Sequence, residues 1–243
     1  MRARALALFW SITPLLIFLS TWEFLVAGSP SRQFLFASPR AVLQVAVIDL
    51  STRALWSDIW YTTIEAALGL LVGTCCGTLG GMFLWATPSL SRILRPYLVI
   101  VSAIPIFALA PMLTIWFGTG LLAKVAMASF ATFFVSLTQA FDGATLASDR
   151  YLTYGRSLGA SRGQLIRKLV LPGASAWVLA GIRLNIGLAL VGAFIGEFIS
   201  SEAGLGHYIV KSGSLYDTPR VLLGVAIFST LALLANLATL SRR

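Results

Sequence analysis

The side chains that could take part in acid–base or metal chemistry are few and far apart in this sequence. Three glutamates, Glu23, Glu65 and Glu197, lie within long apolar stretches, and the one histidine is His207. A metal site needs a cluster of His, Cys, Asp or Glu ligands, and nucleophilic catalysis needs a nucleophile beside a base. Because the sequence holds neither pattern, we expect no metal or cofactor bound by this chain and no catalytic activity.

One short segment, from Tyr154 to Pro172, combines basic and apolar residues. Gly159 and Gly163 predict a turn between short helices, and Pro172 predicts a boundary before the next helix. The apolar residues recur at i, i+7, i+8 and i+11, which predicts one helical face made of Leu158, Leu165, Ile166 and Leu169. Two interpretations stay open: a basic helix resting on anionic lipid, or a docking element for a soluble partner.

The composition places these residues in a membrane protein. Of 243 residues, 58% are hydrophobic and 11% are charged, with a mean hydropathy of +0.86. Soluble domains have about 45–50% apolar and about 25% charged residues, so a soluble enzyme and a disordered scaffold are excluded. The net charge of +9 is interpreted as a topology signal in a lipid bilayer, and no nucleic-acid partner is expected.

Six stretches are long enough to cross a bilayer, for which a helix needs about 20 apolar residues. They predict an all-α integral membrane protein with spans at 5–28, 59–86, 98–117, 121–141, 174–199 and 220–240. The first stretch is longer than the apolar part of a signal peptide, so we expect it to be retained. We expect one transmembrane domain over 1–243, with the first span and an outer segment in 1–58, a five-span core in 59–240, and a cytoplasmic loop at 142–173.

Basic residues predict the orientation. With both termini in the cytoplasm, eleven Lys or Arg lie inside and Arg183 lies near a helix end, which leaves six outside: Arg32, Arg40, Arg53, Lys124, Lys211 and Arg220. In the outer loop, apolar residues from Pro39 to Leu55 recur at helical spacing, which predicts an amphipathic helix. Glu23 and Glu65 are expected near the outer ends of their spans, without Lys or His partners.

Two patterns inside the spans concern packing and the transport pathway. Four glycines at every fourth position predict a ridge where another helix backbone approaches closely: Gly69, Gly73, Gly77 and Gly81. Pro105 and Pro111 predict kinks in the third span, and kinked helices in transporters often line the central cavity. The alternative is that the kinks only shape the bundle. Glu197 is expected to face the cavity.

The loop resembles the EAA signature of permease subunits in binding-protein-dependent ABC importers. Gly159 matches the glycine of that signature, Leu169 replaces its Ile, and Leu171 and Pro172 match its ending, while Thr153–Gly155 stand where Glu-Ala-Ala would be. Further matches resemble the nitrate, sulfonate and taurine branch of the family: Ser38-Pro39, Ala103–Pro105, Ala110-Pro111, Trp116–Gly118, Arg156–Ser161, Ala180–Arg183, Glu197 and Gly204–Gly206.

The resemblance implies a multi-pass subunit of a bacterial inner membrane that pairs with a second permease, most often a copy of itself. Two cytoplasmic ATPase subunits and an extracytoplasmic solute-binding protein complete such an importer. The chain has no Gly-x-x-x-x-Gly-Lys-Ser/Thr phosphate loop, so ATP and Mg²⁺ are expected on the partner ATPase. A sulfonate, nitrate, taurine-like anion or vitamin precursor is the expected solute.

The resemblance also implies two sets of site residues. The ATPase-coupling set is Arg156, Leu158, Gly159, Ala160, Ser161, Arg162, Leu165, Leu171 and Pro172. The translocation-pathway set is Pro105, Pro111, Asn185 and Glu197. Two other functions remain as alternatives: an ion-coupled secondary transporter, which would normally have more intramembrane ionisable residues or broken helices in two halves, and a non-catalytic membrane scaffold.

Overall fold

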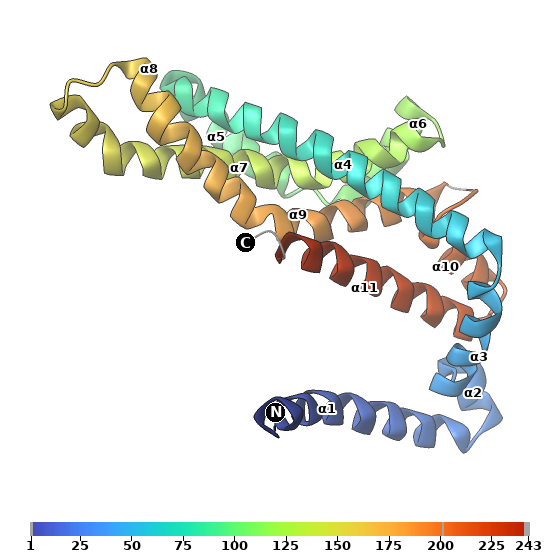
Figure 1. The fold of residues 1–243 in the computed structure, drawn as a ribbon. Coiled ribbons are helices and arrows are strands. Elements are labelled where there is room, and N and C mark those ends of the chain that lie inside the picture. Colours follow the sequence, from blue (N-terminus) through green and yellow to red (C-terminus); the bar gives the residue numbers. More distant parts are fainter. Residues whose placement is uncertain (1, 201, 241–243) are drawn as a thin grey trace.

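The computed structural model describes residues 2–200 and 202–240, without the side chains of 2–9, 11, 12, 149–154, 156, 162 and 240. Every regular element in these residues is a helix, as the sequence predicts (Figure 1). In chain order the elements are α1 (Arg2–Ala27), α2 (Pro30–Phe36), α3 (Pro39–Leu50), α4 (Arg53–Ala86), α5 (Pro88–Ser102), α6 (Ile106–Phe117), α7 (Leu121–Ser157), α8 (Arg162–Leu165), the π-helical turn η1 (Ile166–Val170), α9 (Leu171–Ile199), α10 (Leu205–Ser214) and α11 (Thr218–Leu240).

Four unbroken stretches of helix in the described residues are long and apolar enough to cross a bilayer. They are α4, Leu121–Ser148 of α7, a continuous helix over Gly163–Ile199, and Thr218–Thr239 of α11. Two bent pairs, α2 with α3 and α5 with α6, raise the number to as many as six. The expectation of an all-α membrane protein with about six spans is therefore confirmed in number but not span by span. The α2–α3 pair lies in the expected outer segment, and α1, at the expected first span, contains the shorter apolar helix Thr13–Ala27.

The third span is not the single kinked helix that the sequence predicts. It consists of α5 and α6, which meet at 94° across a short break. The break lies where Pro105 disfavours helical backbone in the residue before it. Pro111, by contrast, lies inside α6, which continues through it. The prediction of two equivalent kinks is therefore wrong, because the first proline ends a helix and the second does not.

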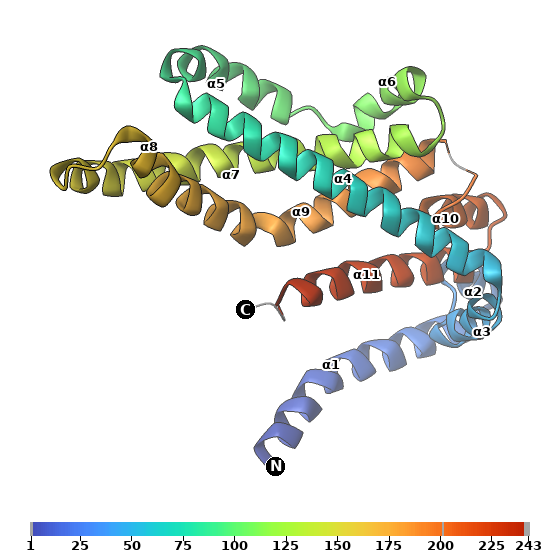
Figure 2. The ribbon, with the colours of Figure 1, turned by 45° about the horizontal axis from the view of Figure 1, so that its top comes forward.

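The centre of the molecule is formed by α7, which packs against both α4 and α9 (Figure 2). The glycine ridge of α4 lies at the contact with α7, and its four glycines are buried. A Cβ atom added at Gly69 would collide with Ala128, and one added at Gly73 would collide with Ser129 and Thr132. The predicted close approach of two helix backbones is confirmed, and the structure identifies α7 as the partner.

The N-terminal helices lie to one side of this centre. In both views α1 stands apart from the bundle, and it contacts α2 and α3. Helix α3 begins at Pro39, where the Ser38 Oγ accepts a hydrogen bond from the Ala41 N–H at 3.2 Å. It ends at Leu50, and Leu55 belongs to α4. The expected helix of the outer loop is therefore present but five residues shorter than predicted.

A charged network fastens α3 to the end of the bundle opposite α8. The Arg220 Nε of α11 donates to Asp49 Oδ2 at 2.8 Å, and the Tyr208 hydroxyl of α10 donates to the same oxygen at 2.6 Å. Arg220 also donates to Asp217 at 2.6 Å. These hydrogen bonds from the Arg220 guanidinium hold the pKa of Asp49 below its usual range, although burial opposes the effect.

We expect Asp49→Asn to loosen the N-terminal helices. Only 7% of Asp49 is exposed, and the substitution removes the charge from bonds worth about 1.5–3 kcal/mol each. Limited proteolysis between α3 and α4 should become faster. Asp217→Asn is the control, because Asp217 pairs with Arg220 from three residues away and does not join α3 to α11. Equal proteolysis of the two variants would contradict the anchoring role of Asp49.

Candidate functional site

The predicted cytoplasmic loop at 142–173 is mostly helical. Helix α7 has 37 residues and is therefore about 55 Å long, against about 30 Å for the apolar core of a bilayer. Beyond residue 142 it packs against the start of α9: a Cβ added at Gly143 would lie 2.8 Å from Trp177, and one added at Gly173 would lie 2.6 Å from Ala147. The segment is a rigid helical hairpin, which we call the coupling hairpin (residues 142–173).

The turn of the coupling hairpin is closed by two successive capping motifs. Gly159 has φ +75°, and the Ala160 N–H donates to the Gly155 carbonyl at 3.0 Å, which is a Schellman ending for α7. The Ser161 N–H then donates to Gln164 Oε1 at 2.9 Å, and the Gln164 N–H donates to Ser161 Oγ at 3.4 Å. This reciprocal pair is a capping box at the start of α8. The turn therefore has one defined shape.

The apolar residues of the hairpin do not form the single helical face that their spacing predicts. Leu158 lies in the turn and is 83% exposed, whereas Leu165 is 3% exposed. Leu165 and Leu169 pack toward Gly155 of α7. The periodicity fails because Gly159 ends the helix between Leu158 and the other three. Arg156 and Arg162, also expected at the site, have side chains outside the described residues.

Pro172 marks a change from a π turn to α-helix without breaking the helix. The helix is continuous from Gly163 to Ile199, and the π turn η1 lies immediately before Leu171 and Pro172. Proline removes one backbone donor and crowds the carbonyl four residues earlier, and a wider π turn relieves that crowding. Pro172 therefore lies in the first turn of α9, at the boundary that the sequence predicts, but the helix does not break there, and α9 connects the turn of the hairpin directly to the bundle.

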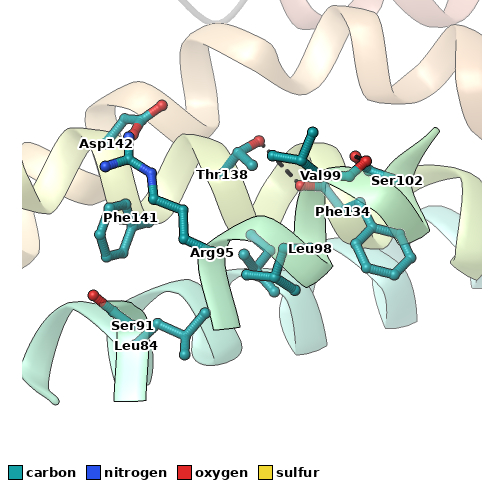
Figure 3. A pocket seen from close by; sticks show the side chains of 11 residues that line it. Leu84, Ser91, Arg95, Leu98, Val99, Ser102, Phe134, Thr138, Phe141 and Asp142 are labelled. Atoms are coloured by element: carbon teal, nitrogen blue, oxygen red, sulfur yellow. Dashed lines mark hydrogen bonds between the residues drawn. The ribbon is translucent and has the colours of Figure 1, made fainter. Parts of the chain in front are cut away.

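A groove runs along α7 beside the break between α5 and α6. It consists of two hollows of about 190 and 380 Å³, which share Ser102, Phe134 and Thr138. Figure 3 shows the first hollow, where the Arg95 side chain extends toward Phe141 and Asp142, and the Arg95 Cζ lies 5.8 Å from the Phe141 ring centre. We call this the α7 groove; its other lining residues are Leu84, Ser91, Leu98, Val99, Ile104, Ile106, Phe130, Ala131, Val135, Leu137, Leu188 and Val191.

The four residues expected in the pathway lie in different surroundings. Asn185 is fully buried and donates to the Ser136 hydroxyl at 2.8 Å, and Glu197 is only 1% exposed. Both therefore serve contacts between helices, and neither lines the α7 groove. Pro105 is exposed at the break beside the groove, and Pro111 is exposed on α6. The α9 side chains that line the groove are those of Leu188 and Val191.

Glu197 belongs to a buried polar cluster that the sequence does not predict. Its Oε1 accepts from the Thr62 hydroxyl and its Oε2 accepts from the Gly206 N–H, both at 2.6 Å. Lys124 Nζ lies 3.6 Å from Glu65 Oε1, and these two residues are 7% and 1% exposed. The expectations of an interfacial Glu65 and an outer-loop Lys124 are wrong, because both side chains are enclosed where α4, α7, α9 and α10 meet.

Comparison with known proteins identifies the class of this molecule. Residues 69–240 match the family model of the binding-protein-dependent transport system inner membrane component. The chain belongs to this family. A probable ABC transporter permease protein of Haemophilus influenzae is 30% identical to this permease over 227 residues, which cover 91% of each chain. The resemblance that the motifs indicate is therefore confirmed.

Other relatives show how widely the family ranges. The formylaminopyrimidine transport permease protein ThiX of Halalkalibacterium halodurans is 29% identical, over 92% of this permease and 90% of its own chain. The taurine transport system permease protein TauC of Escherichia coli is 26% identical, over 93% and 84%. A structure of the MetNI methionine ABC transporter in an inward-facing conformation shares the fold, with a TM-score of 0.67 and 19% identity over 76% of this permease and 92% of that chain.

Two features of the permease could have been found in its sequence. Ser161 and Gln164 have the Ser-x-x-Gln spacing of a capping box, which marks a helix start directly after the Gly159 turn. Lys124 lies near the start of the fourth span, and Glu65 and Glu197 lie near the outer ends of the second and fifth spans, so all three are expected at a similar depth in the bilayer. Comparing the depths of charged residues across spans would have grouped these three.

Proposed function

We propose that this permease forms the membrane pathway of an ATP-driven importer together with a second permease subunit, most simply another copy of itself. It binds neither ATP nor Mg²⁺ and catalyses no reaction. Two cytoplasmic ATPase subunits hydrolyse ATP, and an extracytoplasmic binding protein delivers the solute. The family description, which names an inner membrane component of binding-protein-dependent transport, supports the membrane location and the binding protein. The relative named as an ABC transporter permease and the fold shared with the MetNI methionine ABC transporter support the ATPase partners.

The observation that carries the proposal is the coupling hairpin. Its turn, residues 158–161, presents Leu158 and Gly159 to solvent, and both of its arms continue as helix into the bundle. An ATPase that grips the turn would therefore tilt α7 and α9 as stiff levers. Leu158, Gly159, Ala160 and Ser161 make the contact, while Leu165 supports the turn from inside.

The exposed apolar flank of α1 supports the proposed contact with a second subunit. This flank is unoccupied within the described part of this chain, and Phe18 and Phe24 are 62% and 82% exposed. Helix α1 begins and helix α11 ends on the side of the molecule that carries α8 (Figure 1). If α8 faces the cytoplasm, both termini do as well, in agreement with the distribution of basic residues.

The solute is a small polar molecule, such as a sulfonate, nitrate or taurine-like anion. Relatives named for taurine and for formylaminopyrimidine support a small solute and differ in its chemistry. The α7 groove contains one cation, Arg95, and one acid, Asp142, with the hydroxyls of Ser91, Ser102 and Thr138 nearby. An anion would gain a charge-assisted hydrogen bond from this guanidinium.

Thiol labelling tests the pathway. In a background with Cys75 and Cys76 replaced by serine, Thr138→Cys and Val191→Cys should change several-fold in their rate of labelling by a membrane-impermeant reagent when ATP is added. Both positions are exposed in the α7 groove, on the two helices that the hairpin moves. Leu79→Cys, 71% exposed on α4 and outside the groove, is the control.

The same preparations test the partners. An ATPase should co-purify with the permease, because the proposal assigns the turn of the coupling hairpin to binding that ATPase. Unchanged labelling at Thr138→Cys and Val191→Cys in the presence of that ATPase and ATP would contradict the pathway. Absence of any ATPase would contradict the importer itself.

A further inference from the structure

The buried cluster of α4, α7, α9 and α10 carries an unbalanced charge. Glu65 and Glu197 are each 1% exposed, and the basic group enclosed with them among the described residues is Lys124, which pairs with Glu65. Glu65 Oε1 lies 3.6 Å from Lys124 Nζ, but Glu65 Oε2 has no hydrogen-bond donor among the described residues. A carboxylate oxygen enclosed without a donor is strongly unfavourable, so this atom requires a ligand.

The position of the two carboxyl groups identifies that ligand. Thr62, one turn before Glu65 on α4, donates to Glu197 Oε1 at 2.6 Å. Lys124, whose Nζ faces Glu65, packs its side chain against Gly196, the residue before Glu197, so both carboxyl groups lie in the same enclosed cluster. Ionised carboxylates only accept hydrogen bonds, so two of them enclosed together repel unless one carries a proton. We propose that Glu65 and Glu197 form a proton-binding site, in which Glu65 Oε2–H donates to the Glu197 carboxylate.

The neighbouring groups fit one bound proton. With it, the cluster contains one carboxylate and the Lys124 ammonium, so the enclosed charges balance, which lowers the cost of burying them. Asp58, one turn before Thr62 on α4, donates nothing and accepts from the Gly204 N–H at 2.8 Å. On α10, neither His207 nor Lys211 supplies the missing donor, since Glu65 Oε2 has no hydrogen-bond partner among the described residues.

The site also holds α10 against the bundle. Gly204, the N-cap of α10, has φ +107°, and a Cβ there would collide with the Glu197 carboxylate. Thr62 Oγ1 accepts from the Leu205 N–H at 2.9 Å, and Glu197 accepts from the Gly206 N–H. If water entered the site, the proton would pass to it, and two adjacent carboxylates would repel beneath the start of α10. Seating of α10 is therefore favoured at low pH and weakened as the pH rises.

Glu65→Gln tests the site, because the amide N–H₂ supplies a permanent donor in place of the proton. In the full-length protein in lipid nanodiscs, infrared spectra of the wild type should contain the carbonyl band of a buried protonated carboxylic acid, and Glu65→Gln should lack it. Thermal stability of the wild type should fall as the pH rises from about 5 to 9, following loss of about one proton. Glu65→Gln should lose that pH dependence and stay folded.

Two comparisons complete the test. Glu197→Gln should be less stable than Glu65→Gln at every pH. Thr62 and the Gly206 N–H donate to different oxygens of Glu197, and an amide has one oxygen, so its NH₂ group would face one of these donors. Glu202→Gln, on the exposed turn before α10, should behave as the wild type in both measurements. If the wild type lacks the carbonyl band, both glutamates are ionised and the proposal is wrong. If Glu65→Gln retains the full pH dependence, Glu65 does not carry the proton, and the proposal is wrong as well.

Discussion

Replacing Gly159 with leucine should abolish ATP-driven uptake while the permease still accumulates in the membrane. Gly159 has φ +75°, and a Cβ placed there meets no atom of this chain within 4 Å. The added side chain therefore does not disturb the fold by collision. It stands at the exposed turn of the coupling hairpin, where the ATPase has to approach the backbone. Uptake by membrane vesicles and ATPase stimulation by the solute-loaded binding protein measure the loss.

Backbone strain and side-chain bulk can be separated at this position. A residue with a Cβ in the left-handed region costs about 1–2 kcal/mol, and asparagine tolerates that region better than most. Gly159→Asn should therefore restore the shape of the turn and leave only the effect of bulk. Gly28→Leu is the matched control, since it too has open space, without a positive φ, and lies between α1 and α2. Normal uptake by Gly159→Leu would rule out docking at the turn.

The helical spans were predictable because a bilayer imposes their composition, but their ends were not. The apolar run of the fourth span stops near residue 141, and the helix continues to Ser157. Beyond the apolar run, α7 is stabilised by packing, since Gly143 allows Trp177 to approach and Ala147 meets Gly173. Hydropathy indicates which residues lie in the apolar core of the bilayer. It contains no information about two helices that pack against each other outside the bilayer. The sequence therefore suggested a loop where the molecule has a rigid hairpin.

The candidate site was predictable to a different extent in each part. The turn at Gly159 could be predicted because glycine is the residue that most readily ends a helix in the left-handed backbone conformation. The buried cluster did not, because Glu65, Lys124 and Glu197 come from three helices, and nothing in their spacing along the chain pairs them. Considered one residue at a time, Glu65 was predicted at the membrane interface and Lys124 in an outer loop. Burial of all three together is a property of how α4, α7 and α9 cross.

The glycine ridge leads to the second large effect: Gly77→Ala should destabilise the permease by about 1–3 kcal/mol, the usual cost of overpacking a well-filled contact. A Cβ at Gly77 would collide with the Phe133 carbonyl and would lie 2.9 Å from the Ser136 Cβ. Because one of these atoms is backbone, α4 and α7 have to move apart along their length. Thermal unfolding in detergent, together with the amount of protein in the membrane, measures the change.

Gly80→Ala is the matched control on the same helix. Its Cβ would lie 3.4 Å from the Leu137 Cδ1, which is an ordinary contact with the end of a flexible side chain. Alanine also favours helix over glycine by about 1 kcal/mol, so this variant should be as stable as the wild type or slightly more stable. The difference between two glycines three residues apart isolates the contact with α7 from helix propensity. If Gly77→Ala proved as stable as Gly80→Ala, the backbones of α4 and α7 would not be in contact at the ridge, and tilting α7 through the hairpin would no longer move α4 with it.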